Sequence, residues 1–215
     1  AFFHDSSASL VRDGEILAAA REERFTRKKN TSSFPINAIK FCLESNGYNI
    51  GDIDAIIFYE KPFLKFERIL ETHLNNAPYS WRTFVKAIPS WLQSKLLMNK
   101  TIKRELKILG DVKDLRILYS EHHLSHAASA YYCSPFNDAI ILTIDGVGEK
   151  TTTSIFHGEG NKIKLLKEFY YPNSIGLFYS AVTYFLGFKV NSGEYKVMGL
   201  APYGNKNSNR FKEFT

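Results

Sequence analysis

Three histidines fall within five positions in the motif EHHLSHA. On a helix, His122 and His126 stand four positions apart and project from the same face. Two imidazole nitrogens can then reach one divalent metal ion, and Asp145, which follows the next apolar run, can supply a third ligand. Cys133 is a rival ligand on roughly the same helix face, although it is as readily a small buried apolar residue. His123 points about 100° away from His122, so we expect it to have a structural or supporting role.

The same histidine spacing has a simpler interpretation. One or both imidazoles can satisfy hydrogen bonds in a packed core or at a helix end, without any metal. Spacing alone does not decide between the two. If a metal is bound, neutral imidazoles and one carboxylate suit iron, zinc or manganese, and they leave positions open for a substrate.

Two short polar turns are candidates for binding phosphate. Residues 4–7 read His-Asp-Ser-Ser, and residues 145–148 read Asp-Gly-Val-Gly. Their backbone N–H groups can face phosphate oxygens, as they do in Gly-rich turns, although an ordinary tight turn is the alternative. The candidate cofactor-contacting residues of these turns are Asp5, Ser6, Ser7, Gly146, Val147 and Gly148.

A third candidate lies in VNSGEYKVMGLAPYG, residues 190–204. Lys196 can meet a phosphate as a point charge, and Glu194 stands close to it in sequence. The alternative is a helix start, with Ser192 as N-cap and Glu194 in the first turn, and both interpretations can hold together. The charged stretch REERFTRKKN, residues 21–30, is interpreted as a solvated loop, with an arginine or lysine that grips an anionic ligand as the alternative.

The composition is that of an ordinary globular protein. Of 215 residues, 44% are apolar and 23% are charged, and this length suggests one or two domains. No run approaches the roughly 18 apolar residues of a membrane span, and no signal peptide is recognised, so we expect no membrane partner. Two cysteines far apart in sequence favour a reducing cytoplasm. Because the chain opens in what reads as the inside of a strand, we expect it to be part of a longer protein.

The net charge of +6 is unevenly placed. Residues 61–118 hold twelve Lys and Arg against five Asp and Glu. A basic segment can attract nucleic acid or phosphorylated ligands. A solvated helical face is the favoured interpretation, so a nucleic-acid partner is not expected.

Apolar periodicity predicts two copies of one arrangement. The first copy reads strand, polar turn, strand, Asp13-Gly14 turn and strand, followed by a helix that Pro35 opens. The second reads strand, Asp-Gly loop, strand, Gly-rich turn and strand, followed by a helix at 175–187 with one apolar face. Two such units predict a duplicated α/β fold with a cleft between two lobes.

Further elements are expected between the two copies. Residues 62–109 look helical in two or three pieces, which Pro78 and Pro89 punctuate. A short buried strand is predicted in IDAIIFYE, and another strand is predicted in LRILYS. A helix is predicted over 121–132, with Ser120 as its N-cap.

The chain resembles one known family. It is similar to the N-terminal domain of the nodulation and cephamycin-type O-carbamoyltransferases in the motifs HDSSASLVRDGEILAAAREERFTR, FPINAIKFCLE, EHHLSHAASAYYCSPF, TIDGVGE, SIGLFYSAVTYFLGF and SGEYKVMGLAPYG. The resemblance implies an actin-like ATPase (ribonuclease H-like) duplicated α/β fold. It implies a first lobe over 1–137 with a helical insert at about 61–115, where the likeness is weakest, and the start of a second lobe over 138–215.

The resemblance also implies an activity. Enzymes of this family make carbamoyl-adenylate from carbamoyl phosphate and ATP in a C-terminal domain, and the N-terminal domain transfers the carbamoyl group to a hydroxyl of a sugar or antibiotic-like metabolite. The implied cofactor is a divalent metal, Fe(II) in the best understood relatives, held by His122, His126 and Asp145. A further aspartate ligand and the C-terminal domain would lie beyond residue 215, so the chain alone would be inactive.

Other residue roles and partners follow from the same resemblance. Gly176 joins the cofactor-contacting residues, and His4 is the candidate base for the acceptor hydroxyl or a contact to the intermediate. Many relatives carry histidine and aspartate where this chain has Asn30 and Thr31, which puts that histidine's role in question here. The implied partners are the small-molecule acceptor and the C-terminal adenylate-forming domain of the same polypeptide, and a homodimer is left open.

Two other functions remain open. A tRNA threonylcarbamoyl transferase shares the fold and the histidine pair, and the basic segment 61–118 slightly favours it, whereas HDSSASLVRDGEI and SGEYKVMGLAPYG count against it. The second is a non-catalytic binding or scaffold domain of the same fold. The intact His122, His126 and Asp145 argue against that alternative, while Asn30 leaves room for it.

Overall fold

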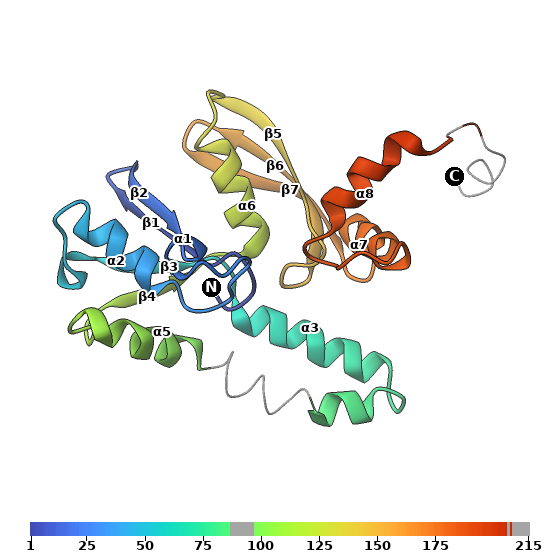
Figure 1. The fold of residues 1–215 in the computed structure, drawn as a ribbon, viewed down its shortest axis with the longest axis horizontal. Helices are drawn as coiled ribbons and strands as arrows, with labels where there is room; N and C mark the ends of the chain where they lie inside the picture. The colour runs from blue at the N-terminus through green and yellow to red at the C-terminus, as the bar shows by residue number, and fades with distance from the viewer. Residues whose placement is uncertain (87–96, 206, 208–215) are drawn as a thin grey trace. The chain divides into compact units, whose positions relative to one another are not determined.

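The structure is a computed structural model that describes residues 1–86, 97–205 and 207. The chain separates into two compact units, residues 1–120 and 121–215. Both units combine helices with small sheets, so the chain is a mixed α/β protein, as predicted (Figure 1). The division into lobes after residue 137 stays a prediction.

The first unit begins with an antiparallel hairpin of β1 (Ser7–Arg12) and β2 (Glu15–Arg21). Asp13 and Gly14 form its turn with positive φ angles of 51° and 86°, the backbone that an Asp-Gly hairpin turn adopts. A strand before the polar turn was predicted, and this was wrong. Phe2 has a left-handed φ of 65° and donates its N–H to Ser32 O at 2.9 Å, which breaks the extended backbone that a strand needs.

The helix α2 (Ile36–Glu44) follows Pro35, as predicted, and packs against the hairpin. Its N-terminus is closed by Glu22, which is 1% exposed. The Glu22 carboxylate accepts the backbone N–H of Ala38 at 2.9 Å and the amide of Asn37 at 2.6 Å. The interpretation of residues 21–30 as a solvated loop is therefore wrong at Glu22, whose charge is held inside by these donors. The short helix α1 (Glu23–Thr26) follows it directly.

The second part of this unit is a parallel pair of β3 (Ala55–Phe58) and β4 (Arg116–Tyr119), both predicted. The helices α3 (Pro62–Asn75) and α5 (Met98–Leu106) stand between them in the chain, and residues 81–86 are also helical. Pro89, predicted to punctuate these helices, lies outside the described residues. Short 3-10 turns occur at Ile50–Asp52 and Lys107–Leu109. The buried core residues are Leu43, Ile50, Phe58, Met98, Ile102, Leu106, Val112 and Leu115.

The second unit contains the predicted strands as an antiparallel sheet of β5 (Asp138–Ile144), β6 (Thr151–Glu159) and β7 (Lys162–Tyr170). The helix α6 (His122–Tyr131) lies against this sheet (Figure 1). Side chains of α6, β5 and β6 interlock into a small core made of Ala127, Tyr131, Ile141 and Phe156. The helix is therefore fixed to the sheet along one face, and its other face is available for a site.

Two helices follow the sheet. These are α7 (Ile175–Phe185), which was predicted, and α8 (Glu194–Leu200), which runs into a 3-10 turn at Ala201–Tyr203. The apolar side chains predicted to share one face of α7 are largely exposed, since Phe178 is 53% and Phe185 is 87% exposed. Among the described helices, none has the length and apolar character that crossing a membrane requires.

Candidate metal centre

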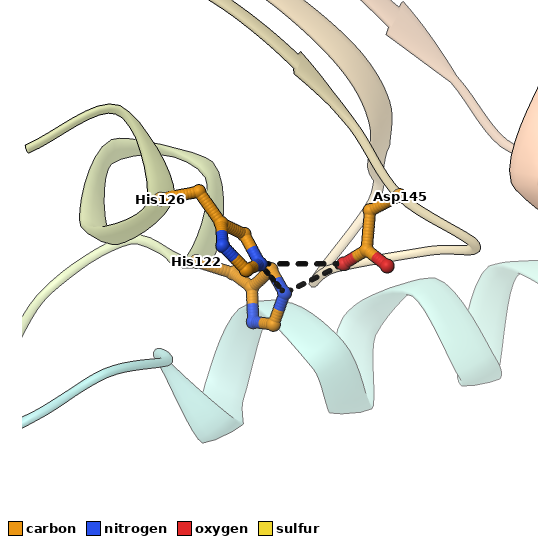
Figure 2. Close-up of side chains that lie close together, drawn as sticks. All are labelled: His122, His126 and Asp145. Atoms are coloured by element: carbon orange, nitrogen blue, oxygen red, sulfur yellow. Dashed lines mark hydrogen bonds and ion pairs between the residues drawn. The ribbon is translucent and has the colours of Figure 1, made fainter. Parts of the chain in front are cut away.

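The helix α6 presents His122 and His126 one turn apart on the same face, as predicted (Figure 2). Asp145 stands directly after β5, and its Oδ2 lies 2.7 Å from His122 Nε2 and 3.8 Å from His126 Nε2. The two Nε2 atoms are 3.0 Å apart. The three ligand atoms therefore converge on one point, with all separations within 4.8 Å.

This geometry fits a divalent transition metal. Metal–ligand bonds of about 2.0–2.2 Å place neighbouring ligand atoms about 3–3.5 Å apart, and the observed separations bracket that range. Two imidazoles and one carboxylate suit iron, zinc or manganese. His126 is 55% exposed on its side chain, so one side of the cluster is open to a further ligand or a substrate. Cys133, the rival ligand, is exposed and is not part of the converging set.

The three groups perturb one another's protonation. The hydrogen bond from His122 and the imidazole of His126, 3.8 Å away, hold the pKa of Asp145 far below its usual range. The nearby Asp145 carboxylate in turn raises the pKa of His126. Without metal, the cluster thus favours a carboxylate beside a protonated imidazole. A metal ion would take the place of that proton, because imidazole binds metals in its neutral form.

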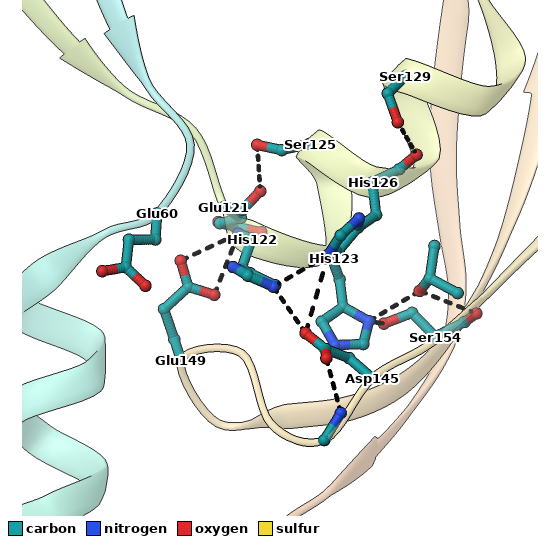
Figure 3. A network of polar contacts seen from close by, with 12 residues as sticks. Glu60, Glu121, His122, His123, Ser125, His126, Ser129, Asp145, Glu149 and Ser154 are labelled. Atoms are coloured by element: carbon teal, nitrogen blue, oxygen red, sulfur yellow. Dashed lines mark hydrogen bonds and ion pairs between the residues drawn. The ribbon is translucent and has the colours of Figure 1, made fainter. Parts of the chain in front are cut away.

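A loop from Asp145 to Glu149 clasps the first turn of α6 (Figure 3). Both oxygens of Glu149 accept the backbone N–H of His122, at 3.0 and 3.1 Å. Gly148 packs so closely that a methyl group added there would lie 3.1 Å from His122 Cβ. The loop thus holds the backbone of His122 through Glu149 and its imidazole through Asp145.

The predicted N-cap of this helix is wrong. Glu121 occupies the N-cap position and makes no side-chain cap hydrogen bond, and Glu149 closes the helix end instead. Ser120 belongs to the first unit, where its N–H extends the parallel strand pairing by donating to Phe58 O at 2.9 Å. Sequence reasoning missed Glu149, because a cap that comes from 27 residues away leaves no local signal.

His123 is buried and hydrogen-bonded, which agrees with the structural or supporting role predicted for it. It is 3% exposed, and its Nδ1 lies 2.7 Å from Thr143 Oγ1. The same nitrogen lies 3.0 Å from Ser154 Oγ, and Figure 3 shows His123 beside Ser154. Burial is the main cause that lowers the pKa of His123, so the ring is held neutral. Sequence reasoning did not single out Thr143 or Ser154. The available signal was a hydroxyl residue at a strand position whose side chain faces the protein interior.

The predicted phosphate-binding loop after β5 uses most of its amides internally. Gly146 N–H donates to Asp145 Oδ1 at 2.7 Å, and Gly148 N–H donates to Thr151 O at 2.9 Å. In the part of the chain that the structure describes, Val147 N–H has no such acceptor, so it is the loop amide left for a ligand. The binding role of this loop stays a prediction.

Gly176 lies at the start of α7, where the helix meets the backbone of this loop. A methyl group added there would lie 2.6 Å from Gly146 N, so only glycine fits. Ser174 caps α7 by accepting Leu177 N–H at 3.0 Å, and its hydroxyl donates to Gly146 O at 2.6 Å. These contacts fix the loop that carries Asp145, which gives Gly176 a packing role beside the cofactor role predicted for it.

The predicted residues of the first polar turn form a polar chain within the first unit. His4 Nδ1 lies 2.8 Å from Asp5 Oδ2, and Arg21 Nη2 donates to Asp5 Oδ1 at 2.7 Å. Ser6 is 1% exposed, and among the described residues its Oγ has no hydrogen-bond partner. Ser7 begins β1 and pairs with Arg21 across the hairpin. The turn thus brings a histidine, its carboxylate partner and an unsatisfied hydroxyl together.

The third candidate motif contains a helix start that differs from the prediction. Gly193 rather than Ser192 is the N-cap of α8. Glu194, the first residue of the helix, reaches back and accepts N–H groups from Asn191 at 2.8 Å and Gly193 at 3.1 Å. These bonds fix the turn that leads into α8, and they are not cap bonds to the helix itself. Lys196 lies 5.9 Å from the ring centroids of Phe188 and Tyr195.

Sequence comparison identifies the class of protein to which this site belongs. The family described as "Carbamoyltransferase N-terminus" matches residues 1–215, so the chain belongs to this family. The resemblance found in the motifs is therefore confirmed.

Individual relatives include an uncharacterized protein and nodulation proteins. Uncharacterized protein sll1178 of Synechocystis sp. is 54% identical over 207 residues, which cover 95% of this chain and 34% of that protein. Nodulation protein NolNO of Sinorhizobium fredii is 38% identical over 220 residues, 99% of this chain and 30% of that protein. Nodulation protein U of the same species is 26% identical over 197 residues, 86% of this chain and 32% of that protein. The chain thus spans about a third of the length of these relatives.

Proposed function

We propose that this chain is the carbamoyl-transfer part of an O-carbamoyltransferase. It would move a carbamoyl group from carbamoyl-adenylate to a hydroxyl of a small molecule, such as a sugar or antibiotic-like metabolite. Membership of the carbamoyltransferase family supports the transferred group. The observation that carries the proposal is the convergence of His122, His126 and Asp145 on one point. Their three ligand atoms lie close enough to bind one ion, and packing of the helix alone does not require this arrangement.

The proposed cofactor is a divalent metal, with Fe(II) as the first candidate. His122, His126 and Asp145 would hold it, and the donor types and separations fit. When bound, the metal supplies positive charge that polarises a carbonyl or neutralises phosphate oxygens. Glu149 and the loop 145–149 would keep the ligands in place.

His4 is the proposed general base. Asp5 accepts from its Nδ1 at 2.8 Å, which fixes the ring and leaves Nε2 to take a proton. In the transfer step, Nε2 accepts the proton of the acceptor hydroxyl as the hydroxyl oxygen bonds to the carbamoyl carbon. The bond from that carbon to the adenylate phosphate oxygen breaks, and AMP leaves with the electron pair.

The remaining polar candidates would bind the adenylate phosphate. The hydroxyl of Ser6 and the amide of Val147 support this role, since neither has a hydrogen-bond partner among the described residues, and Lys196 supports it with its charge. We place the synthesis of carbamoyl-adenylate from carbamoyl phosphate and ATP in a C-terminal domain of the longer protein. An actin-like fold, a cytoplasmic location and a homodimer belong to the same proposal.

The test measures metal content and transfer together. The full-length protein is reconstituted anaerobically with Fe(II), beside a His122→Ala/His126→Ala form and a His157→Ala control. His157 belongs to the same unit and pairs with Asp138 at 3.1 Å, outside the cluster. We expect about one metal per chain in the parent and the control, and none in the double variant.

A His4→Ala form separates the base from the metal centre. It should keep its metal and lose carbamoyl transfer from carbamoyl phosphate and ATP to a panel of sugar acceptors, by roughly 100-fold or more. Metal retained by the double variant, or absent from the reconstituted parent, would contradict the metal centre. Full transfer by His4→Ala would contradict the assignment of the base.

A further inference from the structure

His123 inserts into a pair of hydroxyls that face each other across two strands. Thr143 of β5 and Ser154 of β6 are direct partners in the antiparallel register. The three side chains are buried, with exposures of 3%, 7% and 0%. His123 Nδ1 approaches both hydroxyl oxygens, at 2.7 and 3.0 Å. One helix side chain is therefore tied to both strands at once.

Nδ1 of His123 is the shared hydrogen-bond partner of the two hydroxyls. Thr143 Oγ1 also lies 3.4 Å from Ser154 O, to which it donates. An apolar side chain in place of His123 would leave both buried hydroxyls without this partner.

This contact sets the rotation of α6 about its own axis. His123 lies between His122 and His126 in the helix, with its ring centroid 6.0 and 6.4 Å from theirs. An imidazole nitrogen stands roughly 6 Å from the helix axis, so a rotation of about 20° would move it by about 2 Å. Metal–ligand distances tolerate only about 0.2 Å. Coordination therefore depends on how firmly the adjacent side of the helix, which carries His123, is held.

We propose that His123 is a positioning residue of the metal centre. Its Nδ1, held by the hydroxyls of Thr143 and Ser154, fixes the helix rotation at which His122 and His126 meet Asp145. The inference rests on the proposed metal site and extends it to a residue that does not touch the metal. The ligand side chains are in place before the metal binds, because His123, Thr143 and Ser154 have already fixed the rotation of α6.

The test compares metal affinity with stability in the full-length protein. Cobalt(II) is titrated into metal-free parent, His123→Leu and His123→Asn at a temperature where each is folded, and its visible absorption reports affinity and geometry. Asparagine offers an amide N–H near the position of Nδ1, whereas leucine offers none. We expect His123→Leu to bind about 10–100-fold more weakly with an altered spectrum, and His123→Asn to stay within about threefold of the parent.

Tyr131 provides the matched control. It is 4% exposed, lies two turns further along α6, and donates from its hydroxyl to Asn137 O at 2.8 Å. Tyr131→Phe removes a buried hydrogen bond of the same helix, so it should lower the melting temperature and leave cobalt affinity unchanged. Thr143→Val is the milder second variant, in which His123 keeps only Ser154, and we expect about threefold weaker binding.

The outcomes separate this inference from the proposed function. If the parent and Tyr131→Phe bind no cobalt, the metal centre is wrong and this inference with it. If the parent binds cobalt and His123→Leu binds it equally well with the same spectrum, only the positioning role is overturned. Should His123→Leu fail to fold, a cobalt affinity in Thr143→Val equal to that of Tyr131→Phe would overturn it.

Discussion

Glu149 receives the backbone N–H of His122 on both carboxylate oxygens, at 3.0 and 3.1 Å. The glutamate is 6% exposed, so its charge lies at the N-terminus of α6 largely out of water, where the helix dipole favours it. The residue that it caps is also the one whose Nε2 lies 2.7 Å from Asp145. His122 is therefore both the residue that Glu149 caps and a member of the candidate ligand set.

Replacing Glu149 should weaken both the fold and the site. We expect Glu149→Ala to lower the free energy of unfolding by about 1–2 kcal/mol, because a helix N–H loses its acceptor. Glu149→Gln keeps an acceptor oxygen, so its free energy of unfolding should fall by less. Urea denaturation of both forms measures the difference. Glu159→Ala, at an exposed position where β6 ends, is the control and should stay within about 0.5 kcal/mol of the parent.

Glu22 plays the same part for α2 in the first unit. Because Pro35 precedes that helix and has no side-chain acceptor, the Glu22 carboxylate supplies the bonds to Asn37 and Ala38. We expect Glu22→Ala to cost about 2–3 kcal/mol, since buried donors lose a charged acceptor. Thermal unfolding checks this, beside Glu15→Ala at an exposed position in β2. Equal melting temperatures of the two variants would argue against the cap.

The features that the sequence predicts well are those set by local geometry. His122 and His126 share a helix face because four residues make about one turn, and the Asp13-Gly14 turn follows from the φ angles of its two residues. Asp145 was found because a polar residue at a strand end leaves the apolar pattern. These predictions needed no knowledge of which segments pack together.

The features that the sequence did not predict come from distant segments. Local rules favoured Ser120 as the cap of α6, whereas the structure uses the carboxylate of Glu149. Glu149 stands 27 residues from the helix end that it closes. The prediction of a strand before the polar turn was wrong for a similar reason, since the N–H of Phe2 donates to Ser32 O instead of to a strand partner. Tertiary hydrogen bonds override local preference at these positions.

Gly176 should tolerate no side chain. A methyl group there would lie 2.6 Å from Gly146 N and would also overlap the carbonyl oxygen of Asp145, and backbone atoms cannot yield cheaply. We expect Gly176→Ala to cost about 1–3 kcal/mol and to weaken metal binding by shifting Asp145. Denaturation and cobalt titration measure the two effects.

Gly199 is the matched control for this substitution. It is also a helical glycine of the second unit, in α8, and a methyl group added there meets nothing within 4 Å. Gly199→Ala should be neutral or stabilise by up to about 1 kcal/mol, because alanine is the better helix former. A Gly176→Ala form as stable as Gly199→Ala would mean that α7 does not press on the loop that carries Asp145.

The metal-free protein should draw stability from the cluster only in a limited pH range. The hydrogen bond from His122 and the nearby imidazole of His126 lower the pKa of Asp145. The contribution of Asp145 to stability is therefore present above its unfolded pKa of about 3.9 and is lost as pH falls through the lower folded value. The Asp145 carboxylate raises the pKa of His126, so the contribution of His126 is complete below about pH 6.5 and is lost as pH rises through the higher folded value. The two contributions coincide between about pH 4 and 6.5.

Asp145→Asn removes the carboxylate on which both shifts depend. With metal chelated, we expect the melting temperature of the parent to exceed that of Asp145→Asn most at pH 5–6, and the gap to narrow by about pH 8.5 as His126 loses its proton. Asp13→Asn, at an exposed turn position where Asn-Gly fits as well as Asp-Gly, controls for the loss of one carboxylate. A gap that widens as the pH rises from 6 to 8.5 would mean that His126 is not protonated against Asp145. The metal would then enter the site without displacing a proton from that imidazole.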